Sequence, residues 1–330
     1  MKKVILLSML AVVAMTGICS CSSRANAGNS GDVGQADSLP VVYYIKDINP
    51  ENILKIYHAL GRKADGTNVA VKISTGESGK SNHLSPALIA PFVNEVKGTI
   101  VECNTAYGGN RSTTADHLKA AEEHGYTAIA NVDIMDADGD TALVVDGGLR
   151  LDKNLVGRHL SDYDFLVVLS HFKEHAMGGF GGALKNVAIG IASADGKAYV
   201  HSAGKVSDPA VLWDNIAEQT AFLESMADAC KSVFDMYGDK KLFINVANRL
   251  SVDCDCNGNP DAPEMGDIGI LASLDPVALD RACVDMVVNS EDPGKAALIE
   301  RINSRQGTHI LDAAEKLGIG SQKYTLVTLE

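Results

Sequence analysis

The sequence lacks a dense cluster of basic residues. Its 330 residues include 29 Lys and Arg against 42 Asp and Glu, which gives a formal net charge of −13. An acidic chain repels phosphate backbones, so we expect no nucleic-acid partner. The 46% hydrophobic and 22% charged residues are ordinary for a globular protein and exclude a disordered chain, a collagen-like repeat and a coiled coil.

The sequence also lacks an apolar run long enough to span a bilayer. The longest early run, Val4 to Met15, follows Lys2 and Lys3 and has the length of a signal-peptide core. It ends in Ile18-Cys19-Ser20-Cys21, which resembles the lipobox of bacterial lipoproteins. The alternative interpretation is a plain secretory signal.

The lipobox interpretation divides the chain into three parts. We predict a lipoprotein signal peptide over residues 1–20, a flexible tether rich in Ser, Gly and Asn over 21–40, and a single α/β domain over 41–330. Cys21 would become the lipidated N-terminus. This predicts a protein of the bacterial cell envelope, anchored to a membrane by lipid and facing the periplasm.

No two of the seven cysteines have the Cys-x-x-Cys spacing. Without Cys19 and Cys21, seven minus two leaves five, an odd number, so a simple disulfide framework is not expected. Cys230 and Cys283 fall in apolar helical stripes and are predicted to be core residues, while the role of Cys103 stays open.

Strand-like and helix-like segments alternate along the chain. The apolar run at 164–170 indicates a strand covered on both faces. The pattern predicts an α/β layered sandwich, with a mainly parallel sheet and helices on both faces. Strands are expected at 41–45, 68–73, 99–103, 164–170, 241–246 and 268–272, and helices at 50–60, 86–96, 114–124, 209–237 and 276–288.

Four polar, glycine-containing loops follow predicted strands, after Ile73, Cys103, Leu169 and Val246. Because ligands bind beyond the carboxyl ends of parallel strands, any site should lie where these loops meet. The first loop, 74–81, approaches the phosphate-binding P-loop pattern but has Ser74 in place of the first glycine, which favours a plain polar loop.

The second loop contains Asn110, a candidate cofactor-binding residue, and Arg111. A guanidinium group can bind a carboxylate with two hydrogen bonds, so Arg111 is a candidate for holding a small anionic molecule. A surface turn with a solvated arginine fits the same residues. His117 and His124, in the helix that follows, are predicted to face solvent.

The third loop, 171–186, is the richest in chemistry, and His201 follows it. Imidazoles bind metals or move protons, and glycines let a ligand approach the backbone closely. A lysine among apolar residues can have a lowered pKa and act as nucleophile or base. The alternative is a glycine hinge with exposed histidines. The candidates in this loop are His171, His175, Gly178, Gly179, Gly181, Gly182 and Lys185.

The fourth loop, 253–264, allows three interpretations. Asp253, Asp255, Asn257, Gly258 and Glu264 have the spacing of a calcium loop. Alternatively, Cys254 and Cys256 point the same way in an extended chain and could present two sulfurs to one soft metal. The third interpretation is a polar turn with idle or oxidised thiols.

Four motifs resemble the domain-of-unknown-function family 362, many of whose members are described as iron–sulfur centre proteins. They lie at 107–117, 171–193, 253–256 and 267–283, so the similarity covers nearly the whole mature chain. The resemblance implies metal or cluster binding but no settled reaction. Some relatives carry a ferredoxin-like Cys-x-x-Cys insertion that this sequence does not have.

The segment HAMGGFGGALK is also similar to a loop of nickel-pincer lactate racemases. In that family the lysine holds the cofactor, a histidine ten residues earlier transfers protons, and a later histidine binds nickel. The resemblance implies these roles for Lys185, His175 and His201. Asn110 stands where those enzymes have their second catalytic histidine.

Together these features predict a protein that binds a metal or metal-containing cofactor, with proton or hydride transfer on a small hydroxy acid as the most concrete reaction. His171, His201, Cys254 and Cys256 are the candidate metal ligands. A nickel-type cofactor, an iron–sulfur group and calcium all stay open. One alternative is a redox accessory that uses Cys254 and Cys256, and another is a non-catalytic binding lipoprotein stabilised by calcium.

Overall fold

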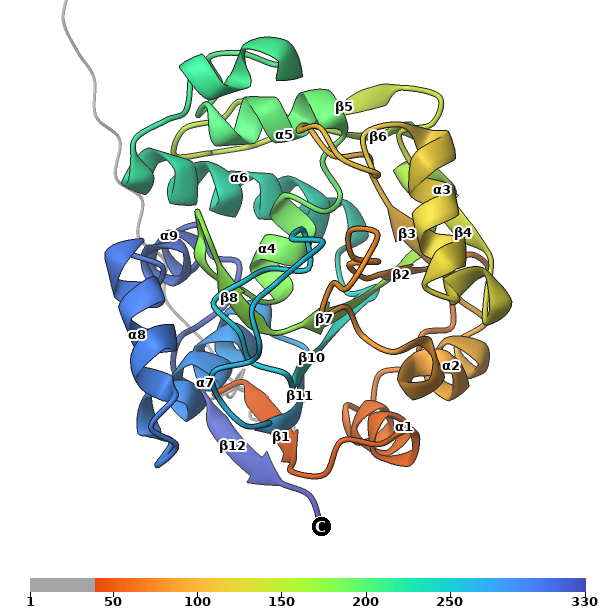
Figure 1. Ribbon diagram of the computed structural model, residues 1–330, viewed down its shortest axis with the longest axis vertical. Helices are drawn as coiled ribbons and strands as arrows, with labels where there is room; N and C mark the ends of the chain where they lie inside the picture. The colour runs from red at the N-terminus through yellow and green to blue at the C-terminus, as the bar shows by residue number, and fades with distance from the viewer. Residues whose placement is uncertain (1–38) are drawn as a thin grey trace, which may run out of the picture. The chain divides into compact units, whose positions relative to one another are not determined.

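The computed structural model in Figure 1 describes residues 39–330, which form an α/β fold around one eight-stranded sheet. The strand order is β12-β1-β11-β10-β7-β2-β3-β4, and only β11 runs antiparallel to its neighbours. The predicted mainly parallel sheet is therefore confirmed. The strands are β1 (Val41–Ile45), β2 (Val69–Lys72), β3 (Thr99–Glu102), β4 (Val132–Ile134), β7 (Phe165–His171), β10 (Lys241–Ala247), β11 (Gly269–Ser273) and β12 (Thr325–Thr328).

Helices cover both faces of this sheet, as predicted. Figure 1 shows α1 and α2 on one side and α4, α6 and α7 on the other. The α-helices are α1 (Pro50–Ala59), α2 (Pro86–Glu95), α3 (Thr114–Glu123), α4 (Ala183–Ala188), α5 (Ala194–His201), α6 (Gln219–Tyr237), α7 (Pro276–Asn289), α8 (Lys295–Ser304) and α9 (His309–Lys316). Residues 39–330 also contain the 3-10 helices η1 (Tyr126–Ala128), η2 (Arg158–Asp162) and η3 (Pro209–Asp214).

The alternation of side chains along β7 divides the apolar core in two. Leu166 and Val168 belong to the core on the side of α4, α6 and α7, whereas Phe165, Val167 and Leu169 belong to the core on the side of α1 and α2. All seven residues of β7 are buried, which is the pattern expected of a strand covered on both faces.

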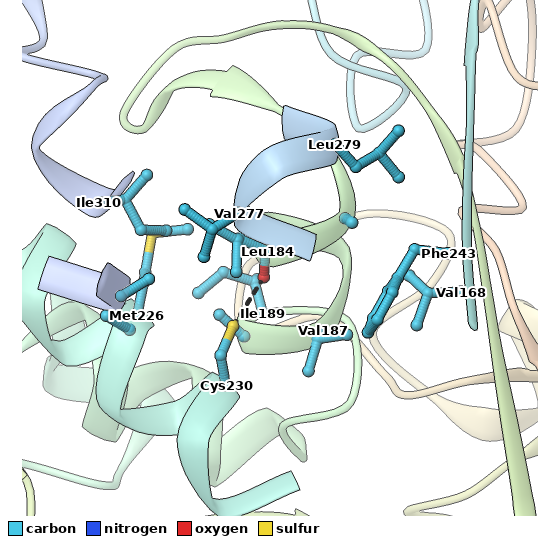
Figure 2. Close-up of a cluster of buried hydrophobic side chains, with 14 of the residues drawn as sticks. Val168, Leu184, Val187, Ile189, Met226, Cys230, Phe243, Val277, Leu279 and Ile310 are labelled. Carbon is cyan, nitrogen blue, oxygen red and sulfur yellow. Dashed lines mark hydrogen bonds between the residues drawn. The ribbon is translucent and has the colours of Figure 1, made fainter. Parts of the chain in front are cut away.

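Figure 2 shows part of the first of these cores, to which Leu184, Met226 and Phe243 belong. The Cys230 thiol donates to the carbonyl of Leu184 at 3.1 Å. Cys230 and Cys283 are both fully buried, so the prediction that they are core residues is confirmed.

Two segments differ from the expected elements. The predicted helix 209–237 is divided into η3 and α6, because Leu212 packs with Ala106 and Ala198 in a small separate apolar cluster. The loop 171–186 contains a short hairpin, β8 (Lys173–His175) and β9 (Gly179–Gly181), followed by the start of α4. A second hairpin joins β5 (Asp140–Val144) and β6 (Lys153–Gly157).

The four loops selected from the sequence share one edge of the sheet, because β3, β2, β7 and β10 run parallel side by side. The first loop packs on the fourth: the Glu77 and Lys80 N–H groups donate to the Asp255 and Gly258 carbonyls at 2.8 and 2.9 Å. No helix starts in the first loop, since α2 begins only at Pro86, so it does not form a P-loop.

No helix among residues 39–330 combines the length and hydropathy needed to cross a membrane. The predicted signal peptide, the lipidated Cys21 and all but the last two residues of the predicted tether lie outside the described residues.

Candidate functional site

A cavity of about 460 Å³ lies at the edge of the sheet where the four loops meet. Its volume falls within the range of about 300 to 1,000 Å³ that is usual for small-molecule sites. The candidate residues that line it are Arg111, His175, Lys185, His201, Cys254 and Cys256. The sequence therefore identified side chains that fold together although they are separated by up to 145 positions (256 − 111).

Three soft donor atoms converge beside this cavity. One ligand atom each from His175, Cys254 and Cys256 lies within 4.8 Å of the others. The hairpin β8–β9 supplies the imidazole and the loop after β10 supplies both sulfurs. The two segments are joined by a hydrogen bond from the Glu174 N–H to the Ser251 carbonyl at 3.1 Å.

The pKa values of the two thiols of this group are shifted in opposite directions. A hydrogen bond from Cys256, the charge of Lys185 and the nearby His175 hold the pKa of Cys254 well below its usual value despite burial. The same hydrogen bond and burial raise the pKa of Cys256 well above its usual value. Cys254 is therefore the thiolate of the pair and Cys256 the thiol.

Lys185 lies beside this thiolate, with its Nζ 3.8 Å from Cys254 Sγ. Burial alone would lower the pKa of Lys185, but Cys254 and Cys256 raise it above its usual value. The expectation of a lowered pKa was wrong, because the sequence did not show that two thiols would face this amine. Lys185 is a cation in this arrangement rather than a neutral nucleophile.

His175 is held in one orientation by its own hairpin. Its Nδ1 accepts the N–H of Gly178 at 2.9 Å, so a neutral ring carries its proton on Nε2. Burial and the charge of Lys185 lower the pKa of His175. The imidazole is thus neutral, and its Nε2–H is the group left to donate to the Cys254 thiolate. A metal that binds at Nε2 would have to displace this proton.

His201 shows the opposite arrangement of its ring nitrogens. Its Nδ1 donates to the Lys197 carbonyl at 2.7 Å, and the ring stacks on Phe222 with centroids 4.8 Å apart. Burial lowers the pKa of His201 to about 4, so the ring is neutral near pH 7. Nε2 therefore has a free lone pair at the cavity, although His201 lies outside the three-donor group.

His171 does not reach the cavity and is not available as the predicted metal ligand. Its Nδ1 is 2.9 Å from Asp255 Oδ1 and its Nε2 donates to the Asn248 carbonyl at 2.7 Å. The other oxygen of Asp255 accepts from Lys173. Both nitrogens of His171 face oxygen acceptors, so neither offers a lone pair.

The same contacts exclude the calcium-loop arrangement of residues 253–264. Asp255 is fully buried between His171 and Lys173. Asp253 accepts the Asp261 N–H at 3.0 Å, and Glu264 accepts the Val252 N–H at 3.0 Å. These carboxylates therefore stabilise the loop itself and do not converge on one point.

The glycines of the third loop serve packing instead of lining the cavity. Gly179 has φ +83° and lies so close to the next segment that a Cβ would be 2.6 Å from the Gly307 Cα. A Cβ on Gly182 would be 2.2 Å from an oxygen of Asp280. Gly178 and Gly181 are buried in the same hairpin, and none of the four is among the cavity residues.

Arg111 and Asn110 have different surroundings despite being neighbours. Arg111 is buried, lines the cavity and donates from Nη2 to the Tyr107 hydroxyl at 3.1 Å. Asn110 is exposed, and its backbone N–H donates to Glu77 at 2.7 Å. The predicted cofactor contact of the Asn110 side chain therefore has no support in the structure.

Three buried charges of the cavity were missed by the sequence analysis. Lys72 donates to Glu102 at 2.7 Å, and Lys197 donates to the Ala192 carbonyl at 2.6 Å. The available signal was a charged residue at the end of each of two apolar strands, VAVK and TIVE.

The prediction that His117 faces solvent was wrong. His117 is fully buried and lies 3.3 Å from the Thr75 hydroxyl, because it is on the inward face of α3.

A four-cysteine iron–sulfur cluster does not fit the described residues. Cys230 and Cys283 are buried in the core around α6 and α7, and Cys103 donates to the Ile191 carbonyl at 3.3 Å. Only Cys254 and Cys256 are in the three-donor group. The donor set found in residues 39–330 therefore suits a single soft metal, with two sulfurs and one nitrogen.

The fold and the site define an α/β protein whose ligand cavity lies at the carboxyl ends of parallel strands, with soft donors beside it. The chain belongs to the family described as Domain of unknown function (DUF362), which it matches over residues 69–285. This range includes every residue that lines the cavity. The resemblance inferred from the four motifs is thus confirmed.

Two solved structures resemble parts of the chain. The lactate racemase apoprotein from Thermoanaerobacterium thermosaccharolyticum shares 17% identity and a TM-score of 0.39, covering 63% of this chain and 51% of its own. A protein from Thermotoga maritima shares 15% identity and a TM-score of 0.40, covering 71% and 57%. The chain thus spans little more than half the length of either structure. No curated protein matches it.

Proposed function

We propose that this protein binds a soft transition metal, or a cofactor that carries one, through His175, Cys254 and Cys256. The observation that carries the proposal is the convergence of three donor atoms from two loops within 4.8 Å. Thiolate and imidazole are the donors that zinc, nickel, copper and iron prefer. Three protein ligands beside a cavity also leave a coordination position for a substrate.

The reaction we propose is a proton or hydride transfer on a small anionic molecule such as a hydroxy acid. A metal at this position would polarise an oxygen of the substrate. Arg111 would hold the carboxylate, and the free Nε2 of His201 would accept a proton. Lys185 keeps a positive charge beside the sulfurs and would offset the charge of the bound anion.

Metal analysis of the full chain tests this proposal. Protein purified anaerobically without chelator is expected to contain about one equivalent of metal per chain, or to take up one cobalt(II) ion with sulfur-to-cobalt charge-transfer absorption. Cys254→Ser, Cys256→Ser and His175→Ala should each lose most of this binding. Cys283→Ala, which also removes a buried cysteine, should keep it.

Two results would overturn the proposal. One is metal binding that survives removal of both Cys254 and Cys256. The other is wild-type protein that binds no cobalt(II), zinc or nickel after full reduction of its thiols.

A redox accessory is the second candidate function. The observation that favours it is that two of the three donors are sulfur, a ligand set that suits iron and copper as well as zinc. Reversible bleaching of the metal's absorption by dithionite would support this candidate, and an inert zinc site would contradict it.

A further inference from the structure

The side chains that line the cavity beside the three-donor group are of two chemical kinds. Arg111, Tyr107 and Lys185 are charged or polar, and we call them the charged wall. Leu212 and Trp213 of η3, together with Ile189, are apolar, and we call them the apolar wall. A ligand that satisfies both walls must itself have a charged part and an apolar part.

The arginine of the charged wall is held by two long ion pairs and by one side-chain hydrogen bond, to Tyr107. Arg111 is only 5% exposed, its Nε has no hydrogen-bond partner, and Glu77 and Glu102 approach it no closer than 3.5 Å. Glu102 is already occupied by Lys72 at 2.7 Å. At 3.5 Å neither carboxylate makes a short, charge-assisted hydrogen bond to the guanidinium group, and a carboxylate bound in the cavity would add one.

The Tyr107 hydroxyl adds a second donor to this wall. It accepts from Arg111 Nη2 at 3.1 Å, which leaves its own proton free for an anion. Burial raises the pKa of Tyr107, so the hydroxyl keeps that proton at physiological pH. Arg111 and Tyr107 are therefore two neighbouring donors among the residues that line the cavity.

The apolar wall includes a large aromatic ring that is exposed to water. Trp213 is the only tryptophan of the chain, and it is 60% exposed although it lines the cavity. Its neighbour Leu212 is buried in the small cluster with Ala106 and Ala198, which fixes η3 at this wall. Covering the exposed ring with an apolar ligand would gain free energy that a small polar anion cannot supply.

We propose that the substrate of this cavity is an amphiphilic organic acid, whose carboxylate binds Arg111 and Tyr107 and whose apolar group of several carbons packs under Trp213. The inference deepens the proposed function because it uses the same cavity, but it does not require the metal. An acid as small as lactate would leave the apolar wall in contact with water. The volume of about 460 Å³ has room for a larger acid.

The test uses the fluorescence of Trp213, which as the single tryptophan reports only on this cavity. The full-length, metal-free protein is titrated with straight-chain monocarboxylates from acetate to decanoate at constant ionic strength. The Kd is expected to fall about fourfold for each added methylene until the apolar wall is covered. The primary amide of each acid should bind about tenfold more weakly or worse.

Two variants separate the walls. Arg111→Met should bring the acids to the affinity of their amides, while Arg150→Met, which removes an arginine that pairs with Glu224 at the surface, should change nothing. Trp213→Ser should reduce the fold-decrease in Kd that each added methylene gives. This variant has no tryptophan fluorescence, so its Kd values are measured by isothermal titration calorimetry.

A Kd that does not vary with chain length would overturn the apolar part of the proposal, and equal affinities for acid and amide would overturn the charged part. Because the protein is titrated without metal, failure of the acid-binding proposal is distinct from failure of the proposed metal site. Metal content is measured separately, and each result can be negative while the other is positive.

Discussion

Single residues of the cavity differ sharply in what their neighbours do to them, and the cysteines show this most clearly. Burial raises the pKa of Cys103, Cys230 and Cys283, whereas Cys256, Lys185 and His175 together lower that of Cys254. Since only thiolates react quickly with alkylating agents, one sulfur among these should react ahead of the rest.

We therefore predict that iodoacetamide labels Cys254 first in the reduced, metal-free protein. At pH 6.5 its alkylation should be about tenfold faster than that of Cys103, Cys230 or Cys283, as read from peptide masses. Lys185→Met should slow the reaction, because it removes the charge that stabilises the thiolate. Lys119→Met, at a side chain 72% exposed, is the matched control. Labelling of Cys103 as fast as that of Cys254 would contradict this electrostatic picture.

The buried pair of Lys72 and Glu102 gives a second prediction for single residues. Glu102→Gln leaves the Lys72 ammonium buried without its carboxylate, and should cost about 3 to 5 kcal/mol of unfolding free energy in urea. Lys231→Met, in an exposed helical pair, should cost at most about 0.5 kcal/mol.

The loss of unfolding free energy caused by Glu102→Gln should also depend on pH. Burial alone would raise the pKa of Glu102, but the charges of Lys72 and Arg111 lower it from 4.5 to about 2. A depressed native pKa stabilises the fold above the unfolded value and loses that effect as pH falls through the native one. The difference between wild type and variant should thus be full above about pH 4.5 and shrink toward pH 2. A difference that stays constant down to pH 3 would show that Glu102 acts through packing.

At the scale of elements, the sequence predicted what short-range patterns determine. The strands at the centre of the sheet were predictable because apolar runs such as 164–170 allow few other structures. The division of 209–237 was not, because it depends on Leu212 packing against Ala106, more than a hundred positions away. The inward face of α3 that buries His117 is likewise set by its contact with Thr75.

The candidate site was predictable to a similar degree. The rule that parallel strands share a carboxyl edge placed Arg111, His175, Lys185 and the two cysteines together. The rule could not show that His171 would pair with Asp255. Nor could it show that Gly179 and Gly182 would pack against Gly307 and Asp280. Those outcomes depend on the direction in which each side chain points from its loop, and residue spacing does not determine this direction.

The short helix α4 carries Lys185, and its N-terminus depends on one buried carboxylate. Asp280 accepts the N–H groups of Ala183 and Leu184 at 2.7 and 2.9 Å, and also the Asn245 amide at 2.8 Å. We predict that Asp280→Ala lowers the unfolding free energy by about 2 to 4 kcal/mol and also weakens cobalt(II) binding, because it loosens α4.

A second capping aspartate provides the control for this prediction. Asp275 accepts the N–H groups of Val277, Ala278 and Ser321 at the start of α7. Asp275→Ala should lower stability by a similar amount in urea and leave cobalt(II) affinity unchanged. If both variants weaken cobalt(II) binding equally, Asp280 affects the site only through global stability.

At the scale of the whole molecule, an acidic protein contains a cationic cavity. The net charge is −13, yet Lys72, Arg111, Lys185 and Lys197 all line the cavity and Glu102 is the one carboxylate among its described lining residues. Local positive potential in a cleft raises the concentration of anions there even when the overall charge is negative. The distribution of charge thus favours the same ligand class as the contacts of Arg111.

The signals that we propose for the position of the protein in the cell lie in residues before the described fold. We propose that the chain is cut before Cys21 and anchored through lipid on that cysteine, as the sequence Ile18-Cys19-Ser20-Cys21 indicates. The full chain expressed in a Gram-negative host should then be found in the membrane fraction. Its N-terminal peptide should begin at Cys21 and carry the mass of the acyl chains.

Cys21→Ala should block this processing and remove the acyl mass, because no thiol is left to receive the lipid. Cys19→Ala should leave both unchanged, since that cysteine lies within the predicted signal peptide. Cleavage at another position, with a mature N-terminus free of lipid and protein released from the membrane, would instead identify a plain secretory signal. The cavity would then face the same compartment, but from a protein that diffuses freely.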